Sequence, residues 1–173
     1  MKINTEQKTQ IEKINDSCEN YKYAYNSQNE KFIKLGNWLE KESNIFKNEA
    51  DNKKINKPNF KRGEIIKVDF GINIGSELSN THFAIVLNND DNNSVDNITV
   101  LPLTSKKGYK RLPLGKILKP FYNNEKYNKE TYALITQITT ISKNKIFYDN
   151  IRCSCNKDII DKINIEIINF LTK

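Results

Sequence analysis

The stretch of sequence that decides the fold runs from Lys61 to Asp90 and reads KRGEIIKVDFGINIGSELSNTHFAIVLNND. Two short segments within it, 64–70 and 81–87, are rich in Ile, Val and Phe. Segments of this length and composition are typical of β-strands. Between them lies Gly75-Ser76-Glu77, whose residue types favour a turn. The stretch therefore predicts two consecutive strands that are joined by a turn.

Further short segments of the same kind follow along the chain at 98–103, 131–138 and 145–151. Clusters of Gly, Asn, Asp or Ser separate them, and no helical pattern lies between them. Several short strands without intervening helices predict a small antiparallel barrel or sandwich. The predicted fold class is therefore mainly β with helices, that is, α+β.

An amphipathic helical pattern closes the chain. Asn156 is of a residue type that caps the N-termini of helices. The apolar residues after it fall on one side of a helix: Ile160, Ile163, Ile167, Phe170 and Leu171. The sequence therefore predicts a small barrel that is followed by a C-terminal helix.

The first third of the chain has a different period. Apolar residues recur at heptad spacing over this region: Ile11, Ile14, Cys18, Tyr21, Tyr25, Phe32, Leu35, Leu39 and Phe46. This spacing predicts helix, and the polar residues 26–29 are a plausible place for the helix to turn back. We prefer two helices that pack on themselves or on the barrel to one long coiled-coil helix. With 49–59 as a linker, the predicted domains are 1–59 and 60–173.

Composition limits the class of protein. The chain has 173 residues and a net charge of +7, which favours an acidic partner. It contains no apolar run long enough for a membrane span and no start that resembles a signal peptide. We therefore expect a soluble cytoplasmic protein that makes no contact with a membrane.

The cysteines and the histidine argue against a metal site. The chain has three cysteines, Cys18, Cys153 and Cys155, and one histidine. These residues cannot supply the usual set of zinc ligands at the usual spacing. We therefore expect reduced, structural cysteines, no metal and no cofactor.

The densest positive charge follows a Thr-Ser pair. The basic residues between 106 and 119 have no acid among them: Lys106, Lys107, Lys110, Arg111, Lys116 and Lys119. Such a cluster suits phosphate groups, although a solvated loop is the simpler interpretation. Nearby aromatic residues either stack on unpaired bases or cover a small core: Tyr109, Phe121, Tyr122, Tyr127 and Tyr132.

Several side chains in this region can transfer protons or donate hydrogen bonds to a phosphate. Cleavage of a phosphodiester needs a base, an acid, and donors or positive charge on the phosphate. Glu77 and His82 lie five residues apart, close enough in the chain to face one cleft. Thr104 and Ser105 offer hydroxyl groups, although they can also cap the end of a strand.

Taken together, these motifs resemble the MazF/PemK (Kid) toxins of bacterial toxin-antitoxin pairs. The resemblance rests on the basic Arg62-Gly63, the strand-turn-strand pattern with Gly75-Ser76-Glu77, and two later matches, PLTS at 102–105 and LITQITTIS at 134–142. It covers about Phe60 to Lys173. It implies an SH3-like barrel, which these toxins share with the gyrase-poisoning CcdB, and a homodimer.

The resemblance also implies roles for individual residues. Glu77 matches the glutamate of the Gly-Ser-Glu turn, Thr104 the threonine of the Thr-Ser catalytic motif, and Gln137 a glutamine that shapes the RNA site. His82 stands where the family has a catalytic arginine. This change replaces a fixed planar donor with a group that titrates near neutrality. Ser105 completes the catalytic set.

The function implied is a toxin that cleaves single-stranded RNA, namely mRNA, without metal, and that a cognate antitoxin silences. The residues expected to bind RNA are Arg62, Ser76, Lys106, Lys107, Lys110, Arg111 and Gln137. Two alternatives stay open: a non-catalytic, CcdB-like toxin that acts on a protein such as gyrase, and an RNA-binding protein with a decayed site. The role of 1–59 stays open as well.

Overall fold

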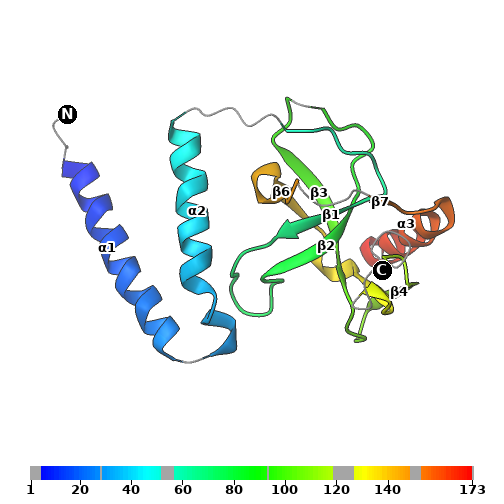
Figure 1. The fold of residues 1–173 in the computed structure, drawn as a ribbon, viewed down its shortest axis with the longest axis horizontal. Coiled ribbons are helices and arrows are strands. Elements are labelled where there is room, and N and C mark those ends of the chain that lie inside the picture. Colours follow the sequence, from blue (N-terminus) through cyan, green and yellow to red (C-terminus); the bar gives the residue numbers. More distant parts are fainter. Residues whose placement is uncertain are drawn as a thin grey trace. The chain divides into compact units, whose positions relative to one another are not determined.

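The structure is a computed structural model that describes residues 5–27, 29–51, 57–92, 94–118, 127–148 and 153–172. The chain divides into two compact units, Met1–Lys53 and Lys54–Lys173 (Figure 1). The sequence had suggested a division after Asn59. Each unit is described by itself below.

The first unit consists of two helices. Helix α1 spans Thr5–Asn26 and α2 spans Leu35–Ala50, with a short 3-10 turn, η1, at Glu30–Phe32 between them. The chain turns back where the polar residues predicted it, and the side chain of Asn29 caps η1 by accepting a hydrogen bond from Lys31 N. The alternative of one long helix is therefore wrong.

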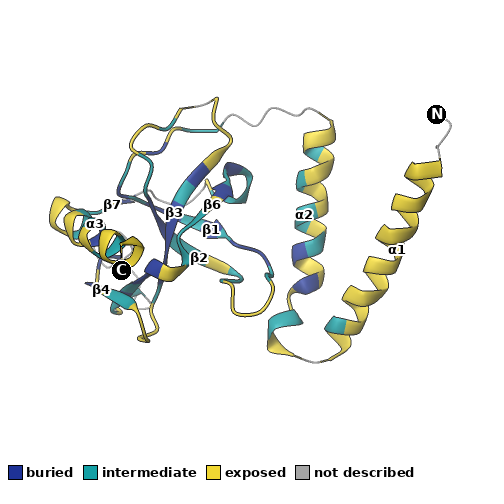
Figure 2. Ribbon diagram, turned by 180° about the vertical axis from the view of Figure 1, so that it is seen from behind, coloured by how far each residue is buried: buried dark blue, intermediate teal, exposed yellow. Residues whose placement is uncertain are grey.

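The two helices differ in how much they bury. Leu35 and Trp38 of α2 are buried, whereas no residue of α1 is (Figure 2). The heptad stripe of α1 is exposed, at 44% for Ile11 and 61% for Ile14. Within the first unit, the stripe of α1 is therefore not buried against α2.

The second unit is an antiparallel sheet. Its strands are β1 (Glu64–Asp69), β2 (Thr81–Val86), β3 (Asn97–Thr104), β4 (Arg111–Gly115), β5 (Thr131–Leu134), β6 (Thr139–Ser142) and β7 (Cys153–Ser154). They follow the order β4-β5-β3-β2-β1-β7, and β6 pairs with β3 beside β5. The α+β class with an antiparallel, curled sheet is confirmed.

Three strand predictions need correction. The segment 131–138 is interrupted after β5, because Ile135–Gln137 forms a 3-10 turn, η3, before β6. In the segment 145–151, Lys145 ends another 3-10 turn, and Ile146 makes only an isolated bridge to Val68; residues 149–151 lie outside the described part. Strand β4 was missed because it lies inside the basic cluster.

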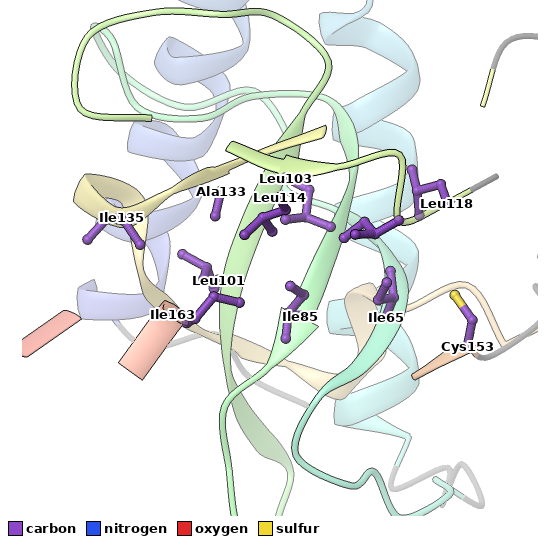
Figure 3. Close-up of a cluster of buried hydrophobic side chains, with 11 residues drawn as sticks. Ile65, Ile85, Leu101, Leu103, Leu114, Leu118, Ala133, Ile135, Cys153 and Ile163 are labelled. Carbon is purple, nitrogen blue, oxygen red and sulfur yellow. The ribbon is translucent and has the colours of Figure 1, made fainter. Parts of the chain in front are cut away.

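The core lies on both faces of the central strands. Side chains alternate along a strand, so Ile65 and Ile85 join one buried cluster while Ile66 and Ala84 join another. The first cluster gathers side chains from β1, β2, β3 and β4 with Ile163 of the C-terminal helix α3, Lys157–Leu171 (Figure 3). Burial on both faces explains why β2 and β3 carry apolar residues at consecutive positions, 83–86 and 100–103.

Helix α3 (Lys157–Leu171) covers the first cluster. Its N-cap is confirmed, since the Asn156 side chain accepts a hydrogen bond from Ile159 N. Ile163 is fully buried, whereas Phe170 and Leu171, which were expected on the covered side, are exposed. These two residues are exposed because the end of α3 extends past the sheet surface that the helix covers.

Gly63 explains how closely α3 approaches β1. Its φ is +86°, and an added Cβ would lie 3.1 Å from Ile160 Cδ1. Its carbonyl oxygen accepts a hydrogen bond from Cys155 N at 2.9 Å. A side chain here would strain the backbone and push α3 away, so the glycine of the Arg-Gly pair is required by packing.

The cysteines are free thiols, exposed at Cys18 and buried at Cys153. Burial raises the pKa of Cys153 to about 11 and that of Cys155 to about 12. In the described part of the chain, none of the helices is long and apolar enough to cross a membrane.

Candidate active site

A cavity of about 310 Å³ opens where β2 begins and β3 ends. Its described lining is Thr81, His82, Phe83, Leu103, Thr104, Ser105, Lys106, Leu118, Tyr127, Lys129, Glu130 and Thr131. The strand register explains the grouping. Ala84 pairs with Pro102 in the antiparallel β2–β3 ladder, so the residues two positions beyond this pair, His82 and Thr104, lie at the same level.

His82 is held by backbone oxygens. Its Nδ1 lies 3.2 Å from the carbonyl oxygen of Leu103, and its ring meets the edge of Phe70 at 6.3 Å between centroids. Burial lowers the pKa of His82; the carbonyls of Leu103 and Ser79 oppose this shift, and Lys106 adds to it. The ring is therefore mainly neutral at pH 7, and donation from Nδ1 to Leu103 leaves Nε2 as the basic nitrogen.

Thr104, Ser105 and Lys106 form the other side of the cavity. The Thr104 hydroxyl oxygen accepts a hydrogen bond from Lys106 N at 3.2 Å. This is the contact expected of a residue that caps the end of a strand. Its hydroxyl proton is still free to donate to a ligand. Ser105 and Lys106 are exposed. Arg111 supports this turn, because its Nη1 donates to Lys106 O at 2.8 Å.

Glu77 and Ser76 do not line this cavity with the other predicted residues. Both are exposed in the loop between β1 and β2. Gln137 supports that loop, since its Oε1 accepts a hydrogen bond from Leu78 N at 3.4 Å. The structure therefore places Gln137 beside the Glu77 loop, and it places His82 with Thr104 instead of with Glu77.

The predicted basic residues fall into two groups. Arg62 is half-buried, and its guanidinium donates to Leu87 O and, at 2.5 Å, to Asn164 Oδ1. It therefore ties the start of β1 to α3 and lies apart from the cavity lining. Lys107 and Lys110 are exposed beside Lys106, and Lys110 Nζ lies 5.4 Å from the centroid of the Tyr109 ring.

Sequence reasoning missed part of the cavity wall. Phe83, Leu118, Lys129, Glu130 and Thr131 were not predicted to belong to a site, and Tyr127 had been named only as one of several stacking candidates. The missing signal was a long-range pairing: Thr104 lies opposite Tyr132 in the β3–β5 ladder. This pairing brings the residues before β5 to the Thr-Ser motif. Phe121, Tyr122 and Lys119 lie outside the described residues.

Among the described residues, no group of three or more His, Cys, Asp or Glu side chains is placed to hold a metal ion. Asp91, one of two adjacent acids after β2, forms an ion pair with Lys143 at 2.7 Å.

The second unit matches a known protein family. Residues 61–171 match the model of the PemK-like, MazF-like toxins of type II toxin-antitoxin systems. The chain belongs to this family. The match spans the second unit from just before β1 to the last turn of α3 and includes all the described residues that line the cavity. No curated protein sequence gave a significant match.

The chain is also similar to solved structures. MazF (Form-I) from Deinococcus radiodurans superposes with a TM-score of 0.51 at 15% identity, over 67% of this chain and 99% of that one. An endoribonuclease from mycobacterial species has a TM-score of 0.44 at 15% identity, over 68% of this chain and 94% of that one. At this identity, the first likeness supports the MazF fold.

Proposed function

We propose that this PemK-like, MazF-like toxin is an endoribonuclease that cleaves single-stranded RNA through attack by the RNA's own 2'-hydroxyl. The observation that carries the proposal is the cavity in which His82, Thr104, Ser105 and Lys106 meet. A proton-transfer group, hydroxyl donors and a cation are thereby gathered at one place. These are the groups that cleavage by internal attack needs.

The reaction divides into two proton transfers around the phosphorus. A base removes the proton of the 2'-hydroxyl, and the 2'-oxygen attacks the adjacent phosphorus. The bond to the 5'-oxygen breaks, and an acid gives that oxygen a proton. The products are a 2',3'-cyclic phosphate and a 5'-hydroxyl. Lys106 and the Thr104 hydroxyl stabilise the charge that develops on the phosphate oxygens.

His82 is the proposed base. Its lowered pKa keeps it neutral near pH 7, and a neutral imidazole can accept a proton, whereas the arginine of other family members remains charged. Glu77 is the second proposed catalytic residue, on the grounds of its match to the Gly-Ser-Glu turn. Because Glu77 is exposed in a neighbouring loop, this role requires that bound RNA bridges the loop and the cavity.

The exposed lysines beside the cavity are the proposed path of the RNA backbone. Lys106, Lys107 and Lys110 follow the Thr-Ser motif without an intervening acid, and each is exposed. Ser76 and Gln137 would contact the RNA from the β1–β2 loop. Arg62 and Arg111, whose guanidinium groups make internal hydrogen bonds, would act by holding the scaffold.

Membership of a type II toxin family implies an antitoxin partner. We infer that the antitoxin binds to the exposed lysines that we assign to the RNA backbone. It would silence the toxin because one charged cleft cannot hold both an antitoxin segment and RNA. The proposal includes a homodimer and a cytoplasmic location, in keeping with a substrate that is mRNA.

A second candidate function is a non-catalytic toxin that binds its target. The observation that favours it is the setting of His82, whose Nδ1 is engaged by the Leu103 carbonyl in the manner of a structural histidine. In this case the barrel would bind a protein or RNA without cutting it.

The deciding experiment incubates the purified protein, free of antitoxin, with single-stranded RNA in excess chelator. We expect cleavage that leaves 2',3'-cyclic phosphate and 5'-hydroxyl ends. Activity that disappears in chelator and returns with magnesium would contradict the mechanism. RNA binding without any cleavage would favour the second candidate.

A further inference from the structure

The cavity has a second half that the proposed chemistry does not use. Phe83, Leu103 and Leu118 provide apolar walls, and Tyr127, Lys129 and Glu130 belong to the rest of the described lining. A volume of about 310 Å³ is at the lower end of the roughly 300–1,000 Å³ of ligand pockets. It suits a single nucleoside better than a paired helix.

Aromatic side chains make this half suitable for a flat ring. Phe83 and Tyr127 meet edge to face, with ring centroids 5.7 Å apart, so one aromatic side chain holds the other in place. Unpaired bases commonly stack on such side chains. Tyr127 and Phe83 also lie partly buried, which limits the entropy lost when a base packs against them.

Glu130 gives this half a defined hydrogen-bonding character. Its Oε1 accepts a hydrogen bond from Gly115 N at 2.8 Å, where β4 ends and β5 begins. The carboxylate is thus oriented by the fold. An ionised carboxylate only accepts hydrogen bonds, and it has lone pairs left after one such contact. It therefore selects a ligand that presents N–H donors.

We propose that the cavity binds one unpaired nucleobase, and that Glu130 selects guanine through its N1–H and N2–H donors. Among the four RNA bases, guanine presents two adjacent donors on its Watson–Crick edge, which match the two oxygens of a carboxylate. Uracil presents one donor between two carbonyl oxygens, which a carboxylate repels. The phosphate of the bound nucleotide lies toward Lys106. This inference rests on the proposed function, because it makes the cavity the base-reading part of the same RNA site.

Glu130→Gln tests whether Glu130 selects guanine. Glutamine keeps one oxygen to accept the hydrogen bond from Gly115 N, so the β4–β5 connection is preserved. The other oxygen becomes an NH₂ group, which donates. A donor facing the guanine N–H groups is repelled, so the preference for guanine should disappear.

The experiment titrates the full chain with GMP, AMP, CMP and UMP separately and follows binding by NMR and calorimetry. We expect GMP to bind at least about tenfold more tightly than UMP, as for a bidentate base contact. Glu130→Gln should reduce this ratio to about one. Tyr127→Leu should weaken the binding of all four nucleotides by about tenfold, as expected of a lost stacking contact. The order of their affinities should not change.

Two results would overturn the inference: equal affinity of the parent protein for all four nucleotides, or a guanine preference that survives in Glu130→Gln. Lys129→Gln is the matched control, because it changes a neighbouring cavity side chain without changing the acceptor. It should lower the affinity for all four nucleotides alike. Since nucleotide binding is measured without cleavage, a guanine preference in a protein that cuts no RNA would refute the proposed function alone.

Discussion

Lys143 and Asp91 form an ion pair inside the barrel: Nζ lies 2.7 Å from Oδ1, and the two side chains are 0% and 1% exposed. Lys143 Nζ also donates to Asn92 O at 3.0 Å, and Asp91 Oδ2 accepts a hydrogen bond from Phe60 N at 2.8 Å. The pair therefore connects the loop after β2, the turn after β6 and the segment that leads into β1.

This geometry predicts a large effect on stability. Lys143→Met leaves the Asp91 carboxylate buried without its cation, and we expect a loss of about 3–5 kcal/mol of unfolding free energy, measured by denaturant titration. The double variant Asp91→Leu/Lys143→Met should recover much of this loss, because it removes both charges. As a control, Lys22→Met removes an exposed pair with Glu19 and should leave the midpoint unchanged. Equal stability of Lys143→Met and the parent would contradict this account.

The same pair shows where sequence reasoning reaches its limit. β1, β2 and β3 could be predicted because burial on both faces makes them rich in apolar residues. Lys143 could not, since Ser-Lys-Asn-Lys reads as a solvated turn until the fold brings Asp91 to it. β4 was not predicted because it contains Pro113 beside basic residues. A proline is tolerated there because β4 lies at one edge of the sheet in the described strand order.

For the site, the local motifs could be recognised in the sequence, whereas the long-range strand pairings could not. His82, Thr104, Ser105 and Lys106 could be named because they lie within two strand-end motifs. Glu130 could not, because only the β3–β5 and β4–β5 ladders bring it to the cavity. The catalytic roles themselves stay predictions.

His82 gives a kinetic prediction. If it is the base, His82→Ala should slow cleavage by roughly 10²–10⁴-fold, while RNA affinity stays nearly constant. The parent rate should fall only when the pH drops well below 6.5, because the pKa of His82 is lowered. His82→Arg should restore part of the rate without this acid limb. Unchanged cleavage by His82→Ala would make the histidine a structural residue and move the search to Lys106, Lys107 and Thr104.

The same pKa shift predicts a pH dependence of stability. Between the lowered pKa of folded His82 and the ordinary value of 6.5, the unfolded chain binds more protons than the folded one. The unfolding free energy should therefore decrease as the pH falls through this window. His82→Gln should show a shallower decrease than the parent in denaturant titrations at several pH values. Identical slopes for the two proteins would show that His82 does not carry this dependence.

The two units predict what a shortened chain retains. Both buried clusters of the barrel begin at Phe60 or later, so a chain that starts at Lys57 should unfold at nearly the same temperature as the barrel of the full chain. A chain that starts at Lys61 loses Phe60, which is 2% exposed, and should lose about 3–5 kcal/mol, as for removal of a buried aromatic residue. Calorimetry distinguishes the two. A strong destabilisation of the longer fragment would show that the barrel needs the helical unit.

The exposed lysines give a prediction about ionic strength. Each phosphate contact on a single strand contributes about 0.7 to the slope of log affinity against log salt concentration. Replacing Lys106, Lys107 and Lys110 by Gln should flatten this slope by up to about 2 and weaken all RNA sequences alike, because phosphate contacts carry no base information. Lys61 and Lys157 are exposed lysines outside this group, and their replacement by Gln should leave the slope nearly unchanged. An unaltered slope in the triple variant would mean that Lys106, Lys107 and Lys110 are only solvated, and that the RNA backbone follows another face of the barrel.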